Sequence, residues 1–217
     1  YSAGYGIPKD VAKAKSLYQN AAEKGYAEAQ HALGLLYLQG EDVERDEREA
    51  FLWVARAAYQ GFVPAQHILG TLYENGNGTA EDPAEALKWY WRAAEQGYAR
   101  AQYNLGLLFI NGKAISRDCE KARSFFQNAA DQGLAEAQYN LGVMYDRGDG
   151  VARNYSKALM WYAASAKQGF APSRERLDYL NSKGIRSRLD PGSGRQEFDE
   201  KAALLQARKG EASLAGR

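Results

Sequence analysis

The sequence predicts an all-α fold made of stacked helix–turn–helix repeats, and three recurring residue types predict it. Glycines recur every 36 residues, at Gly25, Gly61, Gly97, Gly133 and Gly169. Leucines recur with the same period, at Leu33, Leu69, Leu105, Leu141 and Leu177. Alanines do so at Ala50, Ala86, Ala122 and Ala158. A fixed period of about 20 to 50 residues is the signature of a repeat array, in which each unit buries its apolar face against its neighbours.

This register predicts one continuous array over residues 1–181. It comprises a partial unit at 1–24, complete repeats at 25–60, 61–96, 97–132 and 133–168, and a terminal helix at 169–181. Because Tyr1 aligns with Tyr37, we expect the chain to be a fragment of a longer protein. Residues 182–217 leave the register and predict a flexible tail with a possible amphipathic helix at 195–209. A loosely docked or disordered tail is favoured over a helix that folds back or binds a partner.

Each repeat carries the start and stop signals of two helices. In the repeat 25–60, Leu33 and Tyr37 have the spacing of one helix face, and Gly40 predicts the end of that first helix, here called helix A. The second helix, helix B, is predicted to begin after an Asp or Asn N-cap, which recurs at Asp10, Asp46, Asp82, Asp118 and Asn154. Glu85, three residues after Asp82, completes a capping-box pattern, and Glu49 does the same for Asp46.

Two further positions of the register describe the core. Glycine recurs inside helix A, where it costs about 1 kcal/mol relative to alanine, at Gly34, Gly70, Gly106 and Gly142. We interpret these glycines as places where a neighbouring helix passes too close for a Cβ atom. Large aromatic residues recur in helix B and are expected to supply buried surface, at Trp53, Trp89, Phe125 and Trp161.

Composition excludes several classes of protein. The 28 Lys and Arg nearly balance the 27 Asp and Glu, giving a formal net charge of +1, so nothing indicates a nucleic-acid partner. No apolar run approaches the roughly 20 residues that span a bilayer, so direct membrane insertion is not expected. The single cysteine, Cys119, excludes an intramolecular disulfide framework.

The sequence offers no convincing catalytic, metal or cofactor site. His31 and His67 occupy the same helix A position one repeat apart, but no cysteine accompanies them, and we interpret both as surface histidines. Cys119 follows a helix N-cap without a histidine nearby in the sequence, so we interpret it as an inert thiol. No serine stands in a nucleophile-elbow setting. We therefore expect a protein that is not an enzyme and needs neither metal nor cofactor.

Two stretches, AQYNLGLLFINGKAISRDCEKARSFFQNAADQG and AQYNLGVMYDRGDGVARNYSKALMWYAASAKQG, closely resemble Sel1-like repeats, relatives of the tetratricopeptide repeat. The resemblance covers about residues 1–181. Departures are local, namely Phe109 for tyrosine, Lys113-Ala114 for the x-Gly step and Phe125-Phe126 for Trp-Tyr. The resemblance implies a right-handed α/α superhelix that acts as an adaptor or scaffold. It also implies a bacterial envelope-associated, periplasmic or exported protein, with a cytoplasmic one as the alternative.

The solvent side of helix A, which is expected to line the concave face of the superhelix and is here called the helix A surface, is the predicted binding site for a protein or peptide of unknown identity. Its candidate residues are His31, Leu35, His67, Thr71, Arg100, Tyr103, Asn104, Leu107, Tyr139, Asn140, Val143 and Arg147. Asn amides bind a peptide backbone, and Tyr rings give contact area at little entropic cost. Asn104 and Asn140 are equally open to a role in hydrogen bonding between helices, and binding through the convex face or an edge is a further possibility. The alternative function is a glycan- or peptidoglycan-binding envelope module.

Overall fold

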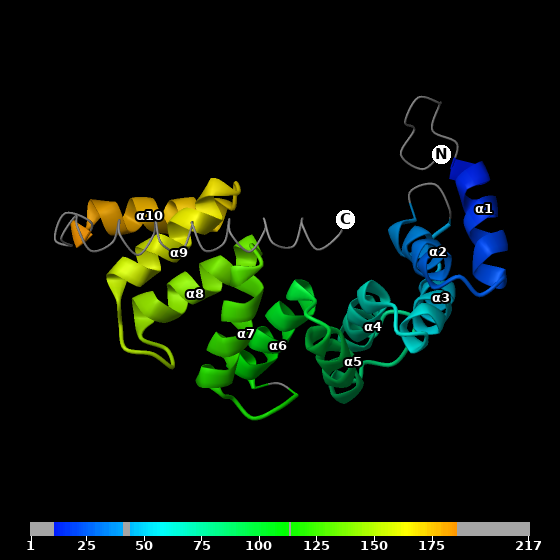
Figure 1. The fold of residues 1–217 in the computed structure, drawn as a ribbon, viewed down its shortest axis with the longest axis horizontal. Coiled ribbons are helices and arrows are strands. Elements are labelled where there is room, and N and C mark those ends of the chain that lie inside the picture. Colours follow the sequence, from blue (N-terminus) through cyan, green and yellow to red (C-terminus); the bar gives the residue numbers. More distant parts are fainter. Residues whose placement is uncertain (1–10, 41–43, 113, 186–217) are drawn as a thin grey trace, which may run out of the picture. The chain divides into compact units, whose positions relative to one another are not determined.

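The computed structural model describes residues 11–40, 44–112 and 114–185, with side chains from residue 15 onward. Within these residues it is all helical and contains no strand, which confirms the predicted fold class (Figure 1). The helices are α1 (Val11–Glu23), α2 (Ala27–Gln39), α3 (Glu47–Tyr59), α4 (Val63–Asn75), α5 (Pro83–Glu95), α6 (Ala99–Asn111), α7 (Cys119–Asp131), α8 (Ala135–Arg147), α9 (Tyr155–Lys167) and α10 (Ala171–Ser182). Even-numbered helices are helix A of a repeat, and odd-numbered helices are helix B.

The chain forms two compact units. The first contains α1 to α5 and α6 through Leu108, and the second contains the end of α6 from Phe109 with α7 to α10. Helices that follow one another in sequence pack together from α1 to α5 in the first unit and from α7 to α10 in the second, as the repeat pattern requires. The possible helix 195–209 and the N-cap Asp10 lie outside the described residues.

Both predicted stop signals form. Helix α4 ends at Gly76, which has a left-handed φ of +71° and donates its backbone N–H to the carbonyl of Leu72. Helix α3 ends in a Schellman motif, because the Gly61 N–H donates to Ala58 at 3.0 Å and the Phe62 N–H donates to Ala57 at 3.1 Å. Both helices of a repeat thus end at defined residues.

The predicted N-caps form, but the capping boxes do not. The Asp82 carboxylate accepts backbone N–H groups from Ala84 and Glu85, both at 3.0 Å. Glu85 does not return the bond, because the Asp82 N–H already donates to the carbonyl of Tyr73 in the preceding helix A at 2.8 Å. This bond, which we call the loop clasp, recurs as Asp46 to Tyr37, Asp118 to Phe109 and Asn154 to Tyr145. The glutamates are therefore available for other partners.

Three of the four helix A glycines, Gly34, Gly70 and Gly142, mark close helix contacts, as predicted. A Cβ atom at Gly70 would lie 2.7 Å from the Tyr90 ring, and one at Gly142 would lie 2.6 Å from the Tyr162 ring. At Gly34 the intruding group is Val54, also at 2.6 Å. Real Cβ contacts are not this short, so helix B reaches its packed position only because helix A lacks a side chain there.

A row of buried glutamines joins successive repeats, a feature that we did not predict. Gln66 Nε2 donates to the carbonyl of Ala58 in the preceding helix B, and its Oε1 accepts from Gln96 Nε2 at 2.8 Å. The same pair of bonds occurs at Gln30, with Ala22 and Gln60, and at Gln138, with Ala130 and Gln168. Each of these glutamine side chains therefore bonds to the last turn of the preceding helix B and to the C-cap glutamine of the following helix B.

Candidate functional site

The candidate residues of the helix A surface divide between the two units. The first unit holds His31, Leu35, His67, Thr71, Arg100, Tyr103, Asn104 and Leu107, and the second holds Tyr139, Asn140, Val143 and Arg147. Arg100 and Arg147 are exposed, His67 is buried, and the others are half-buried. Whether these residues bind a partner is a prediction that their positions do not test.

In the first unit, α6 presents a continuous accessible stripe. Arg100, Tyr103, Asn104 and Leu107 follow one another at the spacing of a single helix face. Ala101, Leu105 and Leu108 on the other side of α6 are buried at 4% exposure or less. The core therefore fixes the position of this stripe, in which Arg100 is exposed and Tyr103, Asn104 and Leu107 are half-buried.

His67 is not a surface histidine, so that interpretation was wrong. Its side chain is only 9% exposed, because the rings of Tyr90 and Tyr98 lie against it with centroid distances of 5.8 and 5.4 Å. Both tyrosines come from elements that follow α4 in the chain. His31, one repeat earlier, is half-buried and packs on Phe62 with a centroid distance of 5.3 Å. The two imidazoles thus fill the spaces between consecutive helices A.

The burial of His67 changes its electrostatics. Asn104 Nδ2 lies 3.3 Å from His67 Nε2, so Asn104 does take part in a contact between helices. His67 Nδ1 is buried and has no hydrogen-bond partner. Burial, followed by the positive charges of Arg100 and His31, lowers the pKa of His67 to about 4. His67 is therefore neutral near pH 7.

A polar cluster lies beside His67 in the first unit. The Tyr90 hydroxyl lies 2.6 Å from the carboxylate of Glu74, to which it donates, and 3.2 Å from Thr71 Oγ1. Burial and the Glu74 carboxylate raise the pKa of Tyr90. Thr71 also donates to the carbonyl of His67 at 3.3 Å. Part of the predicted binding surface thus stabilises the contact between α4 and α5.

In the second unit, packing occupies two of the four candidate residues in part. Tyr139 and Val143 pack against the buried cluster of Ala158, Tyr162 and Leu180. The Tyr139 ring also contacts Phe170, just before α10, with a centroid distance of 5.5 Å. Arg147, at the end of α8, stays exposed. Tyr139 therefore packs between successive repeats as well as forming part of the helix A surface.

A buried carboxylate fastens α10, and sequence reasoning missed it. Asp146 is 5% exposed and accepts from Arg176 through Nε at 2.7 Å and Nη2 at 2.6 Å. The Tyr162 hydroxyl donates to the same carboxylate at 3.2 Å. A sequence signal existed, because tyrosine stands at a core position of helix B 16 residues after an acidic residue in both Glu74–Tyr90 and Asp146–Tyr162.

The described residues hold few clusters of chemically reactive side chains outside the helix A surface. Among them, no group of three or more His, Cys, Asp or Glu side chains could hold a metal ion. Cys119 is a free, half-buried thiol whose Cβ packs close to Gly150. A shallow polar hollow lies beside Arg45, Glu47 and Gly78, and its Glu47 carboxylate already accepts from Arg45 and Asn77.

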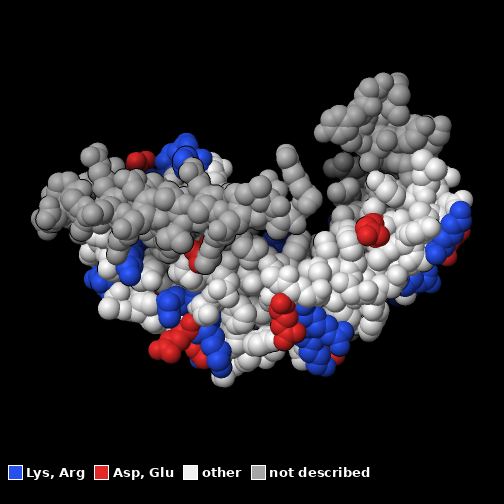
Figure 2. All heavy atoms as spheres, in the orientation of Figure 1, with Lys and Arg blue, Asp and Glu red and all other residues white. Residues whose placement is uncertain are grey.

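The surface charge is mixed. On the face that Figure 2 shows, Lys and Arg lie beside Asp and Glu over the described residues, and neither sign covers a broad area there. Helices in the described part of the chain are 12 or 13 residues long, and none is long and apolar enough to cross a membrane.

The repeat register and its packing glycines match a known family. A family model of the Sel1 repeat matches residues 1–26, 27–62, 63–98, 99–134 and 135–170. The chain belongs to the Sel1 repeat family. Sel1 repeat proteins generally mediate interactions between proteins, and scaffolds of this family are typically not catalytic. No curated protein matches the chain.

Several solved bacterial structures are similar to this Sel1 repeat protein. The protective antigen c5321 of uropathogenic Escherichia coli is 39% identical with a TM-score of 0.75, and the match covers 78% of this chain and 36% of c5321. A Sel1 repeat protein from Oxalobacter formigenes is 36% identical with a TM-score of 0.72, covering 80% and 50%. Immunity protein Pa5087 from Pseudomonas aeruginosa is 28% identical with a TM-score of 0.53, covering 73% and 59%. The chain thus spans half or less of the first two proteins.

Proposed function

We propose that this Sel1 repeat chain is a non-catalytic scaffold that binds a protein segment on its helix A surface. The observation that carries the proposal is the accessible stripe of α6, formed by Arg100, Tyr103, Asn104 and Leu107. It combines a cation, an aromatic ring, an amide and an aliphatic side chain on one rigid face. These side chains suit a peptide, because the Tyr103 ring gives contact area at little entropic cost while Arg100 and Asn104 offer hydrogen-bond donors.

The family supports the proposal in its coarser form, since Sel1 repeat proteins generally bind proteins. The bacterial relatives support a bacterial scaffold, and we extend the proposal to association with the cell envelope. In the second unit, Asn140 and Arg147 are the remaining candidate contacts, because Tyr139 and Val143 are partly occupied by internal packing.

The first experiment identifies the partner and then measures its affinity for matched variants. Protein that copurifies with the tagged chain is identified by mass, produced alone, and titrated against the wild type and against Arg100→Glu with Tyr103→Ala. We expect at least about tenfold weaker binding, as for loss of a central aromatic and an arginine contact. Binding that stays within about twofold of the wild type excludes this stripe as the site.

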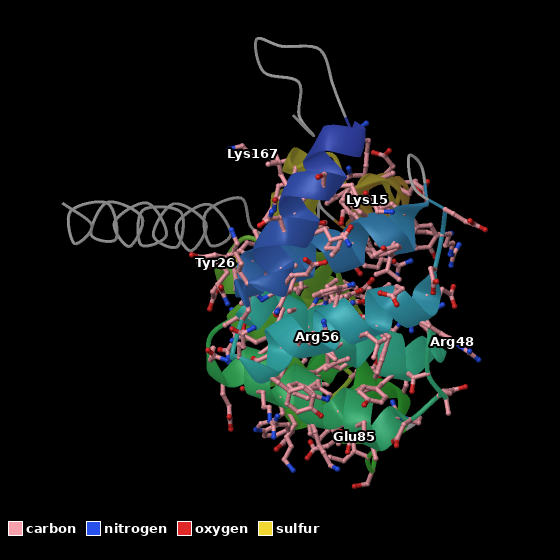
Figure 3. The ribbon with its side chains drawn as sticks, turned by 90° about the vertical axis from the view of Figure 1, so that its right-hand side faces the viewer. Lys15, Tyr26, Arg48, Arg56, Glu85 and Lys167 are labelled. Atoms are coloured by element: carbon pink, nitrogen blue, oxygen red, sulfur yellow. The ribbon has the colours of Figure 1, made fainter. Side chains whose placement is uncertain are left out.

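Arg48→Glu is the control. Arg48 is the second residue of α3, as Arg100 is of α6, and both are exposed. Its side chain projects from the N-terminal end of α3 (Figure 3). The control reverses the same charge at the same helix position but on a helix B, so a loss of affinity confined to the α6 variant separates a local contact from a change in net charge. Binding to purified peptidoglycan or polysaccharide without any protein partner would replace the proposal with the glycan-binding alternative.

A further inference from the structure

His67 lies where three helices of the first unit meet. It belongs to α4, its ring contacts Tyr90 of α5, and it contacts Tyr98 and Asn104 at the start and middle of α6. It is 9% exposed, so these neighbours leave it almost no water. Movement of α6 away from α4 would therefore expose this imidazole.

The joint suits a neutral imidazole and not an imidazolium. Both ring nitrogens of an imidazolium carry a proton, and each buried N–H needs an acceptor. His67 Nδ1 is buried and has no acceptor in the joint. The neutral ring avoids this cost when its single proton lies on Nε2, 3.3 Å from the Asn104 amide, whose oxygen then accepts it.

The charges around the joint act in the same direction. Arg100 of α6 and His31 of α2 place positive charge near His67. The nearby acid on α4 is Glu74, which accepts the Tyr90 hydroxyl of α5 at 2.6 Å. Together with burial, these cations lower the pKa of His67 to about 4, from an ordinary value of 6.5.

We propose that His67 is an acid-sensitive joint, whose protonation opens the contact between α4 and α6. The open form exposes the imidazole and takes up the proton near the ordinary pKa, whereas the closed form takes it up only near pH 4. Between these values the open form holds more protons, so the closed form loses stability as the pH falls through this window and levels off below it. The opening equilibrium rises by up to about tenfold per pH unit, on the order of a hundredfold in total.

The joint also gives the binding surface a means of release. Asn104, Tyr103 and Arg100 share α6, so opening displaces the stripe that we propose as the contact surface. This consequence rests on the proposed function, whereas the opening itself does not. We expect a bound protein segment to dissociate faster near pH 5 than near pH 7.

The direct test is an NMR titration of the imidazole ring protons in the full chain. The wild-type His67 signal should titrate well below an ordinary histidine, in parallel with loss of its ring contacts to Tyr90 and Tyr98. A His67 signal that titrates near 6.5 without any change in those contacts overturns the proposal. This measurement needs no variant, so it stands even if a substitution prevents folding.

Paired variants separate the joint from general acid denaturation. Urea midpoints are measured from about pH 7.5 to about pH 4 for the wild type, His67→Gln and His31→Gln. Glutamine keeps an amide beside Asn104 but gains no charge, so His67→Gln should flatten the acid-dependent loss of stability. His31→Gln, at the same register one repeat earlier, should flatten it less, because His31 is only half-buried and burial lowers its pKa by less. Equal pH dependence in the wild type and His67→Gln contradicts the proposal, whatever their absolute stabilities.

Discussion

Tyr90 of the first unit and Tyr162 of the second occupy the same register position, and each lies against a helix A glycine. Each hydroxyl also donates to an acid on that helix A, Glu74 or Asp146. The remaining neighbours of the tyrosine hydroxyl and its acid differ between the two units. In the first unit they are neutral, because Thr71 and Asn104 surround the Tyr90 hydroxyl. In the second unit they include the Arg176 guanidinium of α10.

The repeat sets how closely its two helices pack, whereas the neighbouring helix sets the charge of the polar network. The glycine and the ring set how closely helix A and helix B approach, and this distance is shared. The charge state of the network depends on the next helix A, which supplies Asn104 in one unit and Arg176 at the same register in the other. A family register therefore predicts shape well and electrostatics poorly.

Gly142→Ala should have the largest effect. The new Cβ would lie 2.6 Å from the Tyr162 ring, so α8 and α9 must move apart, at a cost of about 2–3 kcal/mol to the second unit. Gly70→Ala should do the same in the first unit. Urea unfolding of the full chain measures both.

The control for Gly142→Ala is the same change in a Tyr162→Ala background. With the ring gone, the steric cost should vanish, and the higher helix propensity of alanine should even stabilise by up to about 1 kcal/mol. Additive effects of the two substitutions would refute steric exclusion as the reason for glycine.

Asp146→Asn should have the next largest effect on stability. It should distinguish the network of Asp146 from that of Glu74. It leaves Arg176 without a counter-charge, and because that side chain is 34% exposed, solvent limits the expected loss to about 1–2 kcal/mol. Glu74→Gln should cost less than about 1 kcal/mol, because an amide oxygen still accepts from Tyr90 and no cation is left unpaired. Thermal unfolding of the two variants gives the comparison, and equal losses would mean that the ion pair of α10 adds nothing.

Lys88→Leu should have the smallest effect and concerns the tryptophans of the first unit. Trp53 Nε1 donates to Glu49 at 3.0 Å, whereas Trp89 Nε1 is buried without a partner. The matching acid, Glu85, is held by Lys88, where the earlier repeat has Leu52. Removing the amine should free Glu85 for Trp89 and raise Tm by about 1–2 °C.

An NMR spectrum of the indole N–H protons checks the Lys88 prediction. The Trp89 signal should move towards that of a hydrogen-bonded indole, and the Trp53 signal should stay in place. Leu52→Lys is the reverse change and should draw Glu49 away from Trp53. An unchanged Trp89 signal in Lys88→Leu would show that the lysine does not divert Glu85.

Much of the local structure could be predicted from the sequence, because it depends on short-range signals. Asp82 caps α5, Gly76 ends α4 and Gly70 admits Tyr90, and each requires only the residue and its place in the 36-residue register. These signals recur in every complete repeat, so agreement between copies strengthens each one.

The candidate site was harder to predict, because its state depends on side chains from several helices. His67 shares a register position with half-buried His31, and only the rings of Tyr90 and Tyr98 bury it more deeply. The capping boxes failed for a similar reason, since the Asp82 N–H had already been satisfied by the carbonyl of Tyr73. Propensity describes a residue in its own helix and does not anticipate a partner from the previous one.

The loop clasp has a consequence for engineering this chain. One hydrogen bond joins the last turn of helix A to the N-cap of helix B, so it holds the two ends of each connection together. The connection between Tyr73 and Asp82 therefore begins and ends at two hydrogen-bonded residues. A guest peptide grafted into such a connection, away from Gly78, should therefore leave the helical hairpin beneath it in place.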